Sequence, residues 1–190
     1  MCYGLRSMGT PKKIMDAADI GRAIRRIAQQ VVEANGGAAD LVIVGIHTQG
    51  VFIAERLAAA IGEAEGLAVP LGTMDITLYR DDVGMRAGGP ALPHRAGTRI
   101  PFDITGKIVI LVDDVLNTGR SIRAALDQLM DLGRPKKIQL VGLIDRGGRE
   151  LPIRADFVGR EVTIADDEAV RVRMAGAEGD EEVVVAPKEA

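Results

Sequence analysis

The chain has 190 residues, of which 47% are hydrophobic and 3% aromatic, and this length is typical of a single domain with a core of Val, Ile, Leu and Ala. Its formal net charge of −3 gives no overall attraction to nucleic acid or membrane, so RNA binding would require a local basic face. One cysteine and two histidines exclude a disulfide scaffold and argue against a cysteine- or histidine-based metal site.

The first 13 residues mix Gly, Ser, Pro and charge, and we expect a loose leader there, before a single domain at 14–190. The leader lacks the apolar region of a signal peptide. No other stretch approaches the roughly 18 consecutive apolar residues of a membrane helix. We therefore expect a cytoplasmic protein without a membrane segment.

A helix is predicted over residues 16–35, because apolar residues recur there at three- and four-residue spacing and a glycine pair follows as a stop signal. Arg22, Arg25 and Arg26 share one face of this helix. Such a face is either solvated or attracts an anionic partner, and taken alone these residues favour solvation.

A buried strand is predicted over residues 41–46 and a helix over about 51–61, so that His47-Thr48-Gln49-Gly50 joins a strand end to a helix start. In an open α/β sheet, such loops gather at the carboxyl ends of the strands, where ligands bind. As an isolated feature, the same four residues also fit a plain turn.

A further strand is predicted at 75–79, followed by a segment at 83–98 that is rich in Gly and Pro and has little apolar periodicity. A loop of this length is more often a functional lid than a passive connection. Four arginines flank or occupy it and could close over an anionic substrate: Arg80, Arg86, Arg95 and Arg99.

The centre of the chain places a buried strand at 108–112 before two aspartates, a small-residue loop and a helix that starts near Arg120 or Ser121. A loop that ends in a helix N-terminus offers free N–H groups and the positive end of the helix dipole, which together bind a phosphate. Thr118 and Ser121 add hydroxyl donors, and Gly119 lets the backbone approach closely. The ligand implied is a sugar phosphate.

Asp113 and Asp114 would repel that phosphate, so they must act on something else: ribose hydroxyls, a Mg²⁺ ion or developing positive charge. A regular strand would point the two side chains to opposite faces. Both can therefore reach a ribose only if the chain has already left strand geometry. Otherwise one of the two is structural.

The last third of the chain predicts another buried strand at 138–144 and shorter strands at 156–162, 170–174 and 182–185. The late strands are short and interspersed with charge. We therefore expect them to form a small lobe or an edge ribbon rather than to extend the main sheet.

The stretch VILVDDVLNTGRS, from Val109 to Ser121, closely resembles the phosphoribosyl-pyrophosphate motif of type I phosphoribosyltransferases. Three more stretches, VGIHTQG, DITLYRDD and LIDRGGRELPIRADFVGR, resemble one branch of that superfamily, the bifunctional pyrimidine operon regulators with uracil phosphoribosyltransferase activity. The resemblance runs from about Ile14 to near the C-terminus.

The resemblance implies an α/β type I phosphoribosyltransferase fold, with a small hood from about 145–190 and a flexible flap at about 80–100. The implied reaction converts uracil and phosphoribosyl pyrophosphate to uridine monophosphate (UMP) and pyrophosphate, with Mg²⁺ held mainly by the substrate and through water by Asp113 or Asp114. The implied catalytic residues are Asp113 and Asp114. The implied substrate-binding residues are Thr48, Gln49, Gly50, Arg80, Val115, Leu116, Asn117, Thr118, Gly119, Arg120, Ser121, Asp145 and Arg146.

The resemblance also implies binding to the messenger-RNA leader of pyrimidine genes, promoted by uridine nucleotides such as UMP or UTP, and a homodimer or homotetramer. Candidate RNA contacts are Arg22, Arg25, Arg26, Arg149, Arg154 and Arg160, which together could neutralise several phosphates. Because aromatic residues are scarce, RNA reading would depend on arginine stacking and hydrogen bonds.

Three positions depart from the pattern of this branch and its superfamily. Many members carry Arg where this chain has Gln49, and several carry His where it has Gly148. Purine-using relatives carry an acid at the position of Asn117, so its absence favours a pyrimidine base. The alternative is a phosphoribosyltransferase for uracil or another base in nucleotide salvage without RNA binding. An RNA regulator with little turnover is also consistent with the sequence.

Overall fold

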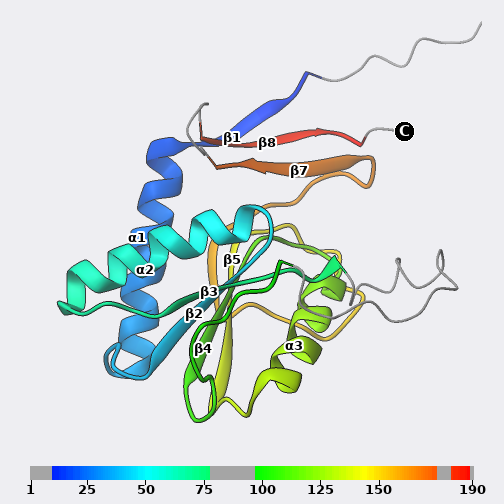
Figure 1. The fold of residues 1–190 in the computed structure, drawn as a ribbon. Helices are drawn as coiled ribbons and strands as arrows, with labels where there is room; N and C mark the ends of the chain where they lie inside the picture. Colours follow the sequence, from blue (N-terminus) through cyan, green and yellow to red (C-terminus); the bar gives the residue numbers. More distant parts are fainter. Residues whose placement is uncertain (1–9, 78–96, 175–180, 189–190) are drawn as a thin grey trace, which may run out of the picture.

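The computed structural model describes residues 10–77, 97–174 and 181–188, and arranges them as an α/β core beside a small second sheet (Figure 1). The elements in chain order are β1 (Lys12–Asp16), α1 (Ala17–Asn35), β2 (Leu41–Ile46), α2 (Gln49–Glu65), β3 (Leu71–Met74), β4 (Ile108–Leu116), α3 (Arg120–Leu132), β5 (Lys137–Asp145), β6 (Phe157–Glu161), β7 (Glu168–Arg173) and β8 (Glu182–Pro187).

The core is a five-stranded sheet in the order β3-β2-β4-β5-β6, and every neighbouring pair is parallel. Helices α1 and α2 cover one face and α3 covers the other, as Figure 1 shows. The three layers confirm the predicted α/β class with a mainly parallel sheet flanked by helices. Because both faces are covered, every residue of β2 is buried, as expected for a continuous apolar strand.

Helix α1 begins and ends at the signals that its sequence predicts. The side chain of Asp16 accepts a hydrogen bond from the N–H of Asp19, and the side chain of Asp19 accepts one from the N–H of Asp16, which forms a capping box. Gly36 ends the helix with φ 67°, a left-handed conformation that favours glycine.

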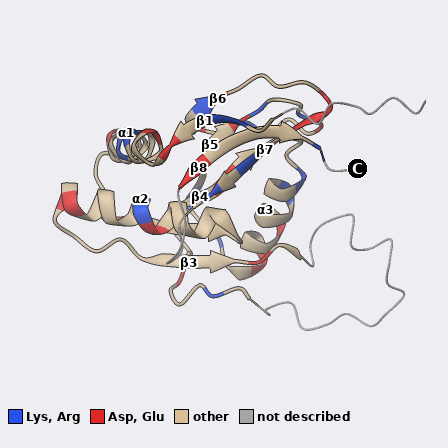
Figure 2. Cartoon of the chain, turned by 90° about the horizontal axis from the view of Figure 1, so that it is seen from above, with Lys and Arg blue, Asp and Glu red and all other residues tan. Residues whose placement is uncertain are grey.

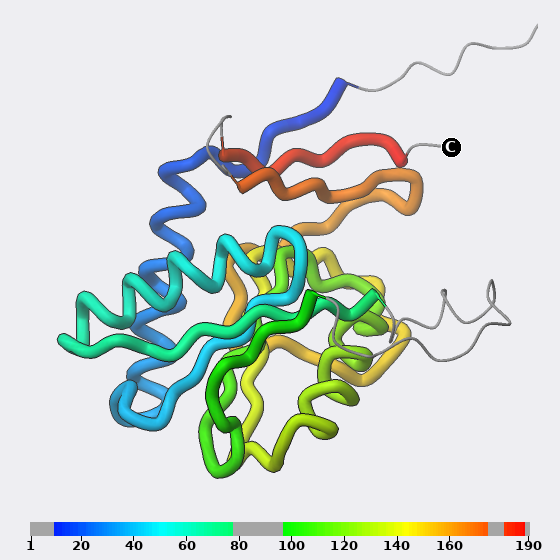
Figure 3. Tube along the Cα trace, viewed as in Figure 1, coloured from blue at the N-terminus to red at the C-terminus, as the bar shows by residue number. Residues whose placement is uncertain are grey.

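A second sheet, which we call the hood sheet, joins the two ends of the described chain in the antiparallel order β1-β8-β7. Figure 3 shows β1 and β8 side by side above the core. Strand β1 starts at Lys12, so the predicted loose leader to residue 13 overlaps an ordered strand. The hood sheet therefore takes one of its three strands from the N-terminal part of the chain, outside the expected range of 145–190.

The late strands divide between the two sheets, which corrects the prediction that none of them extends the main sheet. Strand β6 pairs with β5, from Val141↔Phe157 to Asp145↔Glu161, and forms the edge of the core. Only β7 and β8 belong to the hood sheet. The division follows from burial, because Phe157 is packed under α1 with the core cluster, whereas β7 is mostly half-exposed.

The strand predicted at 75–79 is absent from its described part, residues 75–77, and residues 78 and 79 lie outside the described residues. The strand that the structure shows lies just before it, in β3. Asp75 instead makes local turn contacts, accepting hydrogen bonds from the N–H and hydroxyl of Thr77. The predicted flap falls largely outside the described residues, together with Arg80, Arg86 and Arg95. Its described end is fixed: Thr73 and Arg99 exchange backbone hydrogen bonds of 2.8 Å. Among the described residues no helix is long and apolar enough to span a membrane.

Candidate active site

Two loops that join strand ends to helix starts lie side by side at the carboxyl edge of the core sheet. They follow β2 and β4, which are neighbours in the sheet. The pairing of β2 with β4 stops at Gly45↔Val112, whereas β5 pairs with β4 as far as Leu116↔Asp145. The β2-facing edge of β4 is therefore free of strand partners beyond Val112.

Gly50, in the first turn of α2, packs against this end of β4. A Cβ atom at Gly50 would lie 2.7 Å from the carbonyl oxygen of Val112 and 3.2 Å from the Cα of Asp113. Only glycine fits this approach without a shift of the backbone. The loop before α2, in which the His47–Thr48 peptide bond is cis, is thereby placed against the acidic pair.

Asp113 and Asp114 lie within β4, which continues to Leu116 instead of ending before them. The longer strand follows from its pairing with β5, which also runs on to Asp145. Val112 and Val115 nevertheless belong to the same hydrophobic cluster, on the α1 and α2 face. In a regular strand residues three apart point to opposite faces, so the alternation is interrupted at the acidic pair.

The acidic pair is largely enclosed. Asp113 is 7% exposed and accepts a hydrogen bond of 3.0 Å from the N–H of Asp114, whose own carboxylate accepts one of 2.8 Å from the N–H of Val115. Burial raises the pKa of Asp114 above its ordinary value, and the hydrogen bond from Val115 offsets part of that rise. A carboxylate held in such a site interacts strongly with positive charge that develops beside it.

The loop at 117–121, which we call the phosphate loop, has the geometry that its sequence predicts. Gly119 has φ 90° and stands at the N-cap of α3, without a side chain that could occupy the first-turn N–H groups. Thr118 accepts a 3.3 Å hydrogen bond from the N–H of Arg120. Helix α3 starts at Arg120, as predicted, so its positive end points toward an anion bound at this loop.

The phosphate loop is enclosed from outside by residues 145–153, which we call the clamp segment. The N–H groups of Glu150 and Leu151 both donate to the carbonyl of Thr118, over 3.0 and 3.1 Å. Glu150 also forms an ion pair of 2.7 Å with Arg120. Sequence reasoning assigned this segment to the hood and to RNA contact, and it did not reveal that the segment supports the phosphate loop.

Asp145, the last residue of β5, and Arg146, which follows it, are the residues predicted near the base, and they lie at the same edge. Asp145 accepts from the N–H of Gly147 and forms an ion pair of 2.5 Å with Arg149. The backbone N–H of Arg146 donates to the carbonyl of Leu116 over 3.1 Å. The Nε of Arg146 is buried and has no hydrogen-bond partner among the described residues.

Gln49 faces the hood sheet. Its Oε1 accepts a 3.0 Å hydrogen bond from the N–H of Met174, which follows β7. About two turns further along α2, Arg56 forms an ion pair of 2.5 Å with Glu181, directly before β8. The two contacts tie α2 to both ends of the β7–β8 connection. The predicted role of Gln49 in substrate binding thus falls on a side chain that also links the hood sheet to the core.

The six arginines predicted to bind RNA do not form one uniform face. Arg22 pairs with Asp19 at 2.5 Å, Arg26 donates to the carbonyls of Val158 and Gly159 in β6, and Arg160 donates to the carbonyl of Ile14. Arg26 thus joins α1 to β6 and Arg160 joins β6 to β1, elements that lie near one another in Figure 2, whereas the pair of Arg22 stays within α1.

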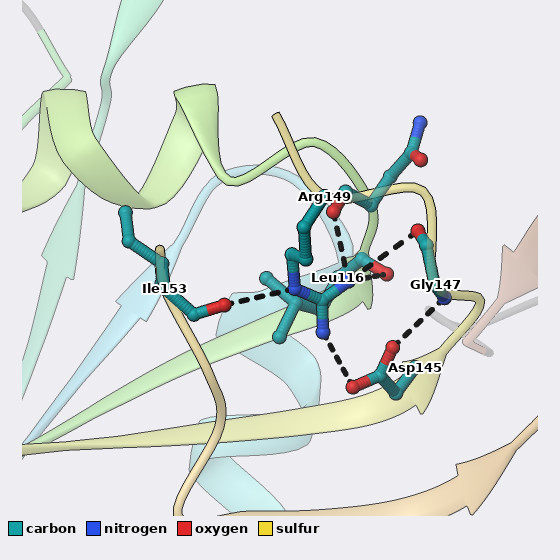
Figure 4. Close-up of polar contacts among 6 residues, drawn as sticks. Leu116, Asp145, Gly147, Arg149 and Ile153 are labelled. Carbon is teal, nitrogen blue, oxygen red and sulfur yellow. Dashed lines mark hydrogen bonds and ion pairs between the residues drawn. The ribbon is translucent and has the colours of Figure 1, made fainter. Parts of the chain in front are cut away.

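The other three arginines lie apart from that group. Arg25 and Arg154 are exposed and have no side-chain partner among the described residues. The head of Arg25 lies on the side of α1 that faces α2, next to Gly21. Arg149 is engaged inside the protein (Figure 4), which contrasts with the prediction that it contacts RNA.

The residues at the acidic pair suit a Mg²⁺ ion that is shared with a substrate. The described part of the chain contains no group of three or more His, Cys, Asp or Glu side chains that could hold a metal by itself. Mg²⁺ prefers oxygen ligands and usually keeps water and phosphate oxygens in its shell beside one or two carboxylates. Asp113 and Asp114 offer that partial set of ligands.

Comparison with known proteins agrees with this geometry. The family model described as phosphoribosyl transferase domain matches residues 12–175. The bifunctional protein PyrR of Chloroflexus aurantiacus is 57% identical over 178 residues, covering 94% of this chain and 96% of the relative. That of Thermus aquaticus is 52% identical over 180 residues, covering 93% and 96%.

Solved structures show the same fold at low identity. A hypoxanthine-guanine phosphoribosyltransferase from Bacillus anthracis superposes with a TM-score of 0.67 at 17% identity, over 96% of this chain and all of that one. A hypoxanthine phosphoribosyltransferase from Trypanosoma cruzi gives 0.63 at 18% identity, over 86% and 81%. The family match and the identities of 52% and 57% show that this chain belongs to the phosphoribosyl transferase domain family and, within it, to the bifunctional PyrR proteins.

Proposed function

We propose that this protein transfers the phosphoribosyl group of phosphoribosyl pyrophosphate to uracil, and that it regulates pyrimidine genes by binding their messenger-RNA leader in response to uridine nucleotides. The observation that carries the enzymatic part is the enclosed acidic pair of β4, with the N-terminus of α2 on one side and that of α3 beyond it. Two anion-binding ends flanking a pair of carboxylates suit a substrate with phosphate at both ends of a ribose.

In this proposal the phosphate loop holds the 5′-phosphate through Thr118, Ser121 and the N–H groups of α3. The loop at 48–50 receives the pyrophosphate. During transfer, the bond from the anomeric carbon to pyrophosphate breaks, its electron pair leaves with the pyrophosphate, and a ring nitrogen of uracil bonds to that carbon and releases its proton. Asp113 and Asp114 orient the ribose and stabilise the positive charge of the sugar in the transition state.

The metal has a limited part in this scheme. Asp113 or Asp114 would hold, through water, a Mg²⁺ ion that the substrate brings with it, and this ion would supply neutralisation of charge on the leaving pyrophosphate. Asp145 and Arg146 lie at the edge where the base would be bound. No covalent enzyme intermediate is required.

An acceptor comparison tests the enzymatic proposal. Purified protein with phosphoribosyl pyrophosphate and Mg²⁺ should form UMP from uracil, and it should form far less product from hypoxanthine or guanine. Turnover of a purine base in preference to uracil would instead support the salvage alternative. If no base is turned over, the result would support the third hypothesis, an RNA regulator that uses the site as a nucleotide sensor.

The regulatory part of the proposal draws on the named relatives and on the arginines around α1 and β6. Binding to the leader transcript of the pyrimidine genes should tighten with UMP and weaken steeply with salt. Arg25→Ala combined with Arg26→Ala should lower RNA affinity and reduce the slope of log affinity against log salt by about two, without a change in uracil turnover. Unchanged affinity in this double variant would remove Arg25 and Arg26 from the RNA site.

A further inference from the structure

Arg149 is the most highly connected side chain of the clamp segment (Figure 4). Its Nε donates to the carbonyl of Ile153 over 2.9 Å, and its Nη2 pairs with Asp145 at 2.5 Å. Its Nη1 donates to the carbonyl of Asn117 over 2.8 Å and, more weakly, to those of Leu116 and Gly147, both at 3.4 Å. With only 23% of its side chain exposed, this arginine is used inside the protein.

These contacts span the two segments that flank the phosphate. Leu116 is the last residue of β4 and Asn117 is the first of the phosphate loop, whereas Asp145, Gly147 and Ile153 belong to the clamp segment. All three nitrogens of the guanidinium take part. A planar group with donors in several directions is the side chain suited to joining several fixed acceptors, and a lysine ammonium, which donates from one atom, cannot reach all of them.

Two glycines, one in the clamp segment and one in the phosphate loop, show that the two segments also pack closely without the side chain of Arg149. A Cβ at Gly148, which has φ 73°, would lie 2.9 Å from the Oδ1 of Asn117. On the far side of the loop, a Cβ at Gly119 would lie 3.4 Å from the Cβ of Ile153. The clamp segment therefore touches the phosphate loop both before the N-cap of α3, at Asn117, and at the N-cap itself, Gly119.

From this geometry we propose that Arg149 is a positioning residue for the phosphoribosyl substrate. It fixes the carbonyls at the start of the phosphate loop, and through Asp145 it fixes the end of β5 beside the base. The loop is then held in its anion-binding form before the substrate arrives, so that binding does not have to order it. The inference rests on the proposed transferase function, because it names a residue that prepares that same site.

The test compares Arg149→Gln and Arg149→Lys with Arg134→Gln, which alters an exposed arginine between α3 and β5 at the opposite end of the sheet. Steady-state kinetics are measured for phosphoribosyl pyrophosphate and for uracil. We expect Arg149→Gln to raise the KM for phosphoribosyl pyrophosphate by about 10-fold or more, with a smaller change in the KM for uracil. Arg149→Lys should recover part of the loss because it retains the charge beside Asp145, and Arg134→Gln should match the wild type.

Thermal unfolding with and without UMP separates positioning from simple support of the fold. Arg149→Gln should show a smaller UMP-induced rise in melting temperature than the wild type. A variant that melts earlier but keeps the wild-type KM values and the full UMP effect would overturn the proposal. If Arg149→Gln does not fold, the same comparison is made with Arg149→Lys. A wild-type protein without turnover would refute the transferase function instead, and the UMP-induced rise would still test Arg149.

Discussion

The two loops of the candidate site each join the end of a core strand to the start of a helix, but different parts of the molecule hold them in place. The phosphate loop after β4 is bound by the clamp segment, which runs from β5 to β6 within the core. The loop after β2 is packed on β4 through Gly50 and is linked by Gln49 to the hood sheet. One end of the substrate site is therefore supported by the core alone, and the other end depends on the hood sheet as well.

The two ends of the proposed substrate would therefore meet loops that are held to different degrees. Arg149 donates to the carbonyls of Leu116 and Asn117, and two backbone bonds to Thr118 add to this support of the proposed 5′-phosphate end. The pyrophosphate end has one side-chain bond to Met174, supported by the more distant pair of Arg56 and Glu181. A change in the hood sheet should thus affect the pyrophosphate end first.

The largest expected effect comes from the acidic pair between the two loops. Asp114→Asn should lower kcat for UMP formation by about 10²-fold, because it removes a charge that stabilises the developing positive charge of the sugar. The KM values should change much less. Turnover within about threefold of the wild type would show that Asp114 is structural and that Asp113 alone serves the ribose.

Gly50→Ala should have the next largest effect, because it separates the loop after β2 from β4. The added Cβ would lie 2.7 Å from the carbonyl oxygen of Val112, and relief of such crowding costs about 1–3 kcal/mol of unfolding free energy. The KM for phosphoribosyl pyrophosphate should rise as well.

Gly21→Ala, in the second turn of α1, is the matched control for Gly50→Ala. Its Cβ would meet only the far ends of two arginine side chains, at 3.4 Å or more, so it should stabilise the protein by up to about 1 kcal/mol. Urea unfolding measures both variants. Equal stability of the two would contradict the close packing of Gly50 on β4.

A smaller effect is expected at Gln49, where two substitutions separate its two roles. Gln49→Ala removes the acceptor for the N–H of Met174 and should lower the unfolding free energy by about 1 kcal/mol. Gln49→Glu keeps an acceptor but adds negative charge near the predicted pyrophosphate position. It should therefore preserve stability and raise the KM for phosphoribosyl pyrophosphate more than Gln49→Ala does. The reverse order of KM values would place Gln49 in the hood contact alone.

The smallest expected effect is that of Asp114 on the free energy of unfolding, and it is recognised by its dependence on pH. Because burial raises its folded-state pKa, the carboxyl opposes folding once it is ionised, and stability falls as pH rises from the ordinary value of 3.8 through the raised pKa. Asp114→Asn has no such titration. It should therefore unfold at higher urea than the wild type at pH 7, and the advantage should disappear near pH 3.5. A constant difference at both pH values would show that the pKa of Asp114 is not raised by folding.

Much of the core could be predicted because its signals are local. The apolar run of β2 and the capped, periodic sequence of α1 each specify one element without reference to the rest of the chain. The short β3 was missed because four residues that include Gly72 carry little pattern. The alternation at 75–79 led to a strand prediction there, but the hydrogen bonds of Asp75 with Thr77 and Thr98 bend the chain at this point.

The supports of the site could not be predicted, since they join residues that are distant in sequence. Arg149 stands in a charged stretch, and nothing in its neighbours shows that carbonyls 32 and 33 positions earlier fold around it. The pairing of β1 with β8 is equally invisible, because Lys12–Asp16 has a single buried residue, Met15. Motif residues of the phosphate loop were found because the loop itself is contiguous.

The pairing of β1 with β8 also determines the order in which the two sheets can fold during synthesis. When the ribosome has released residues as far as β6, all five strands of the core are available, but β1 has no partner until Glu182–Pro187 emerges. The core can therefore form first, whereas the hood sheet, beside which Gln49 accepts its bond from Met174, is complete only after β8 has emerged. A chain cut before β8 would carry two unpaired strand edges, on β1 and β7, and such edges promote aggregation.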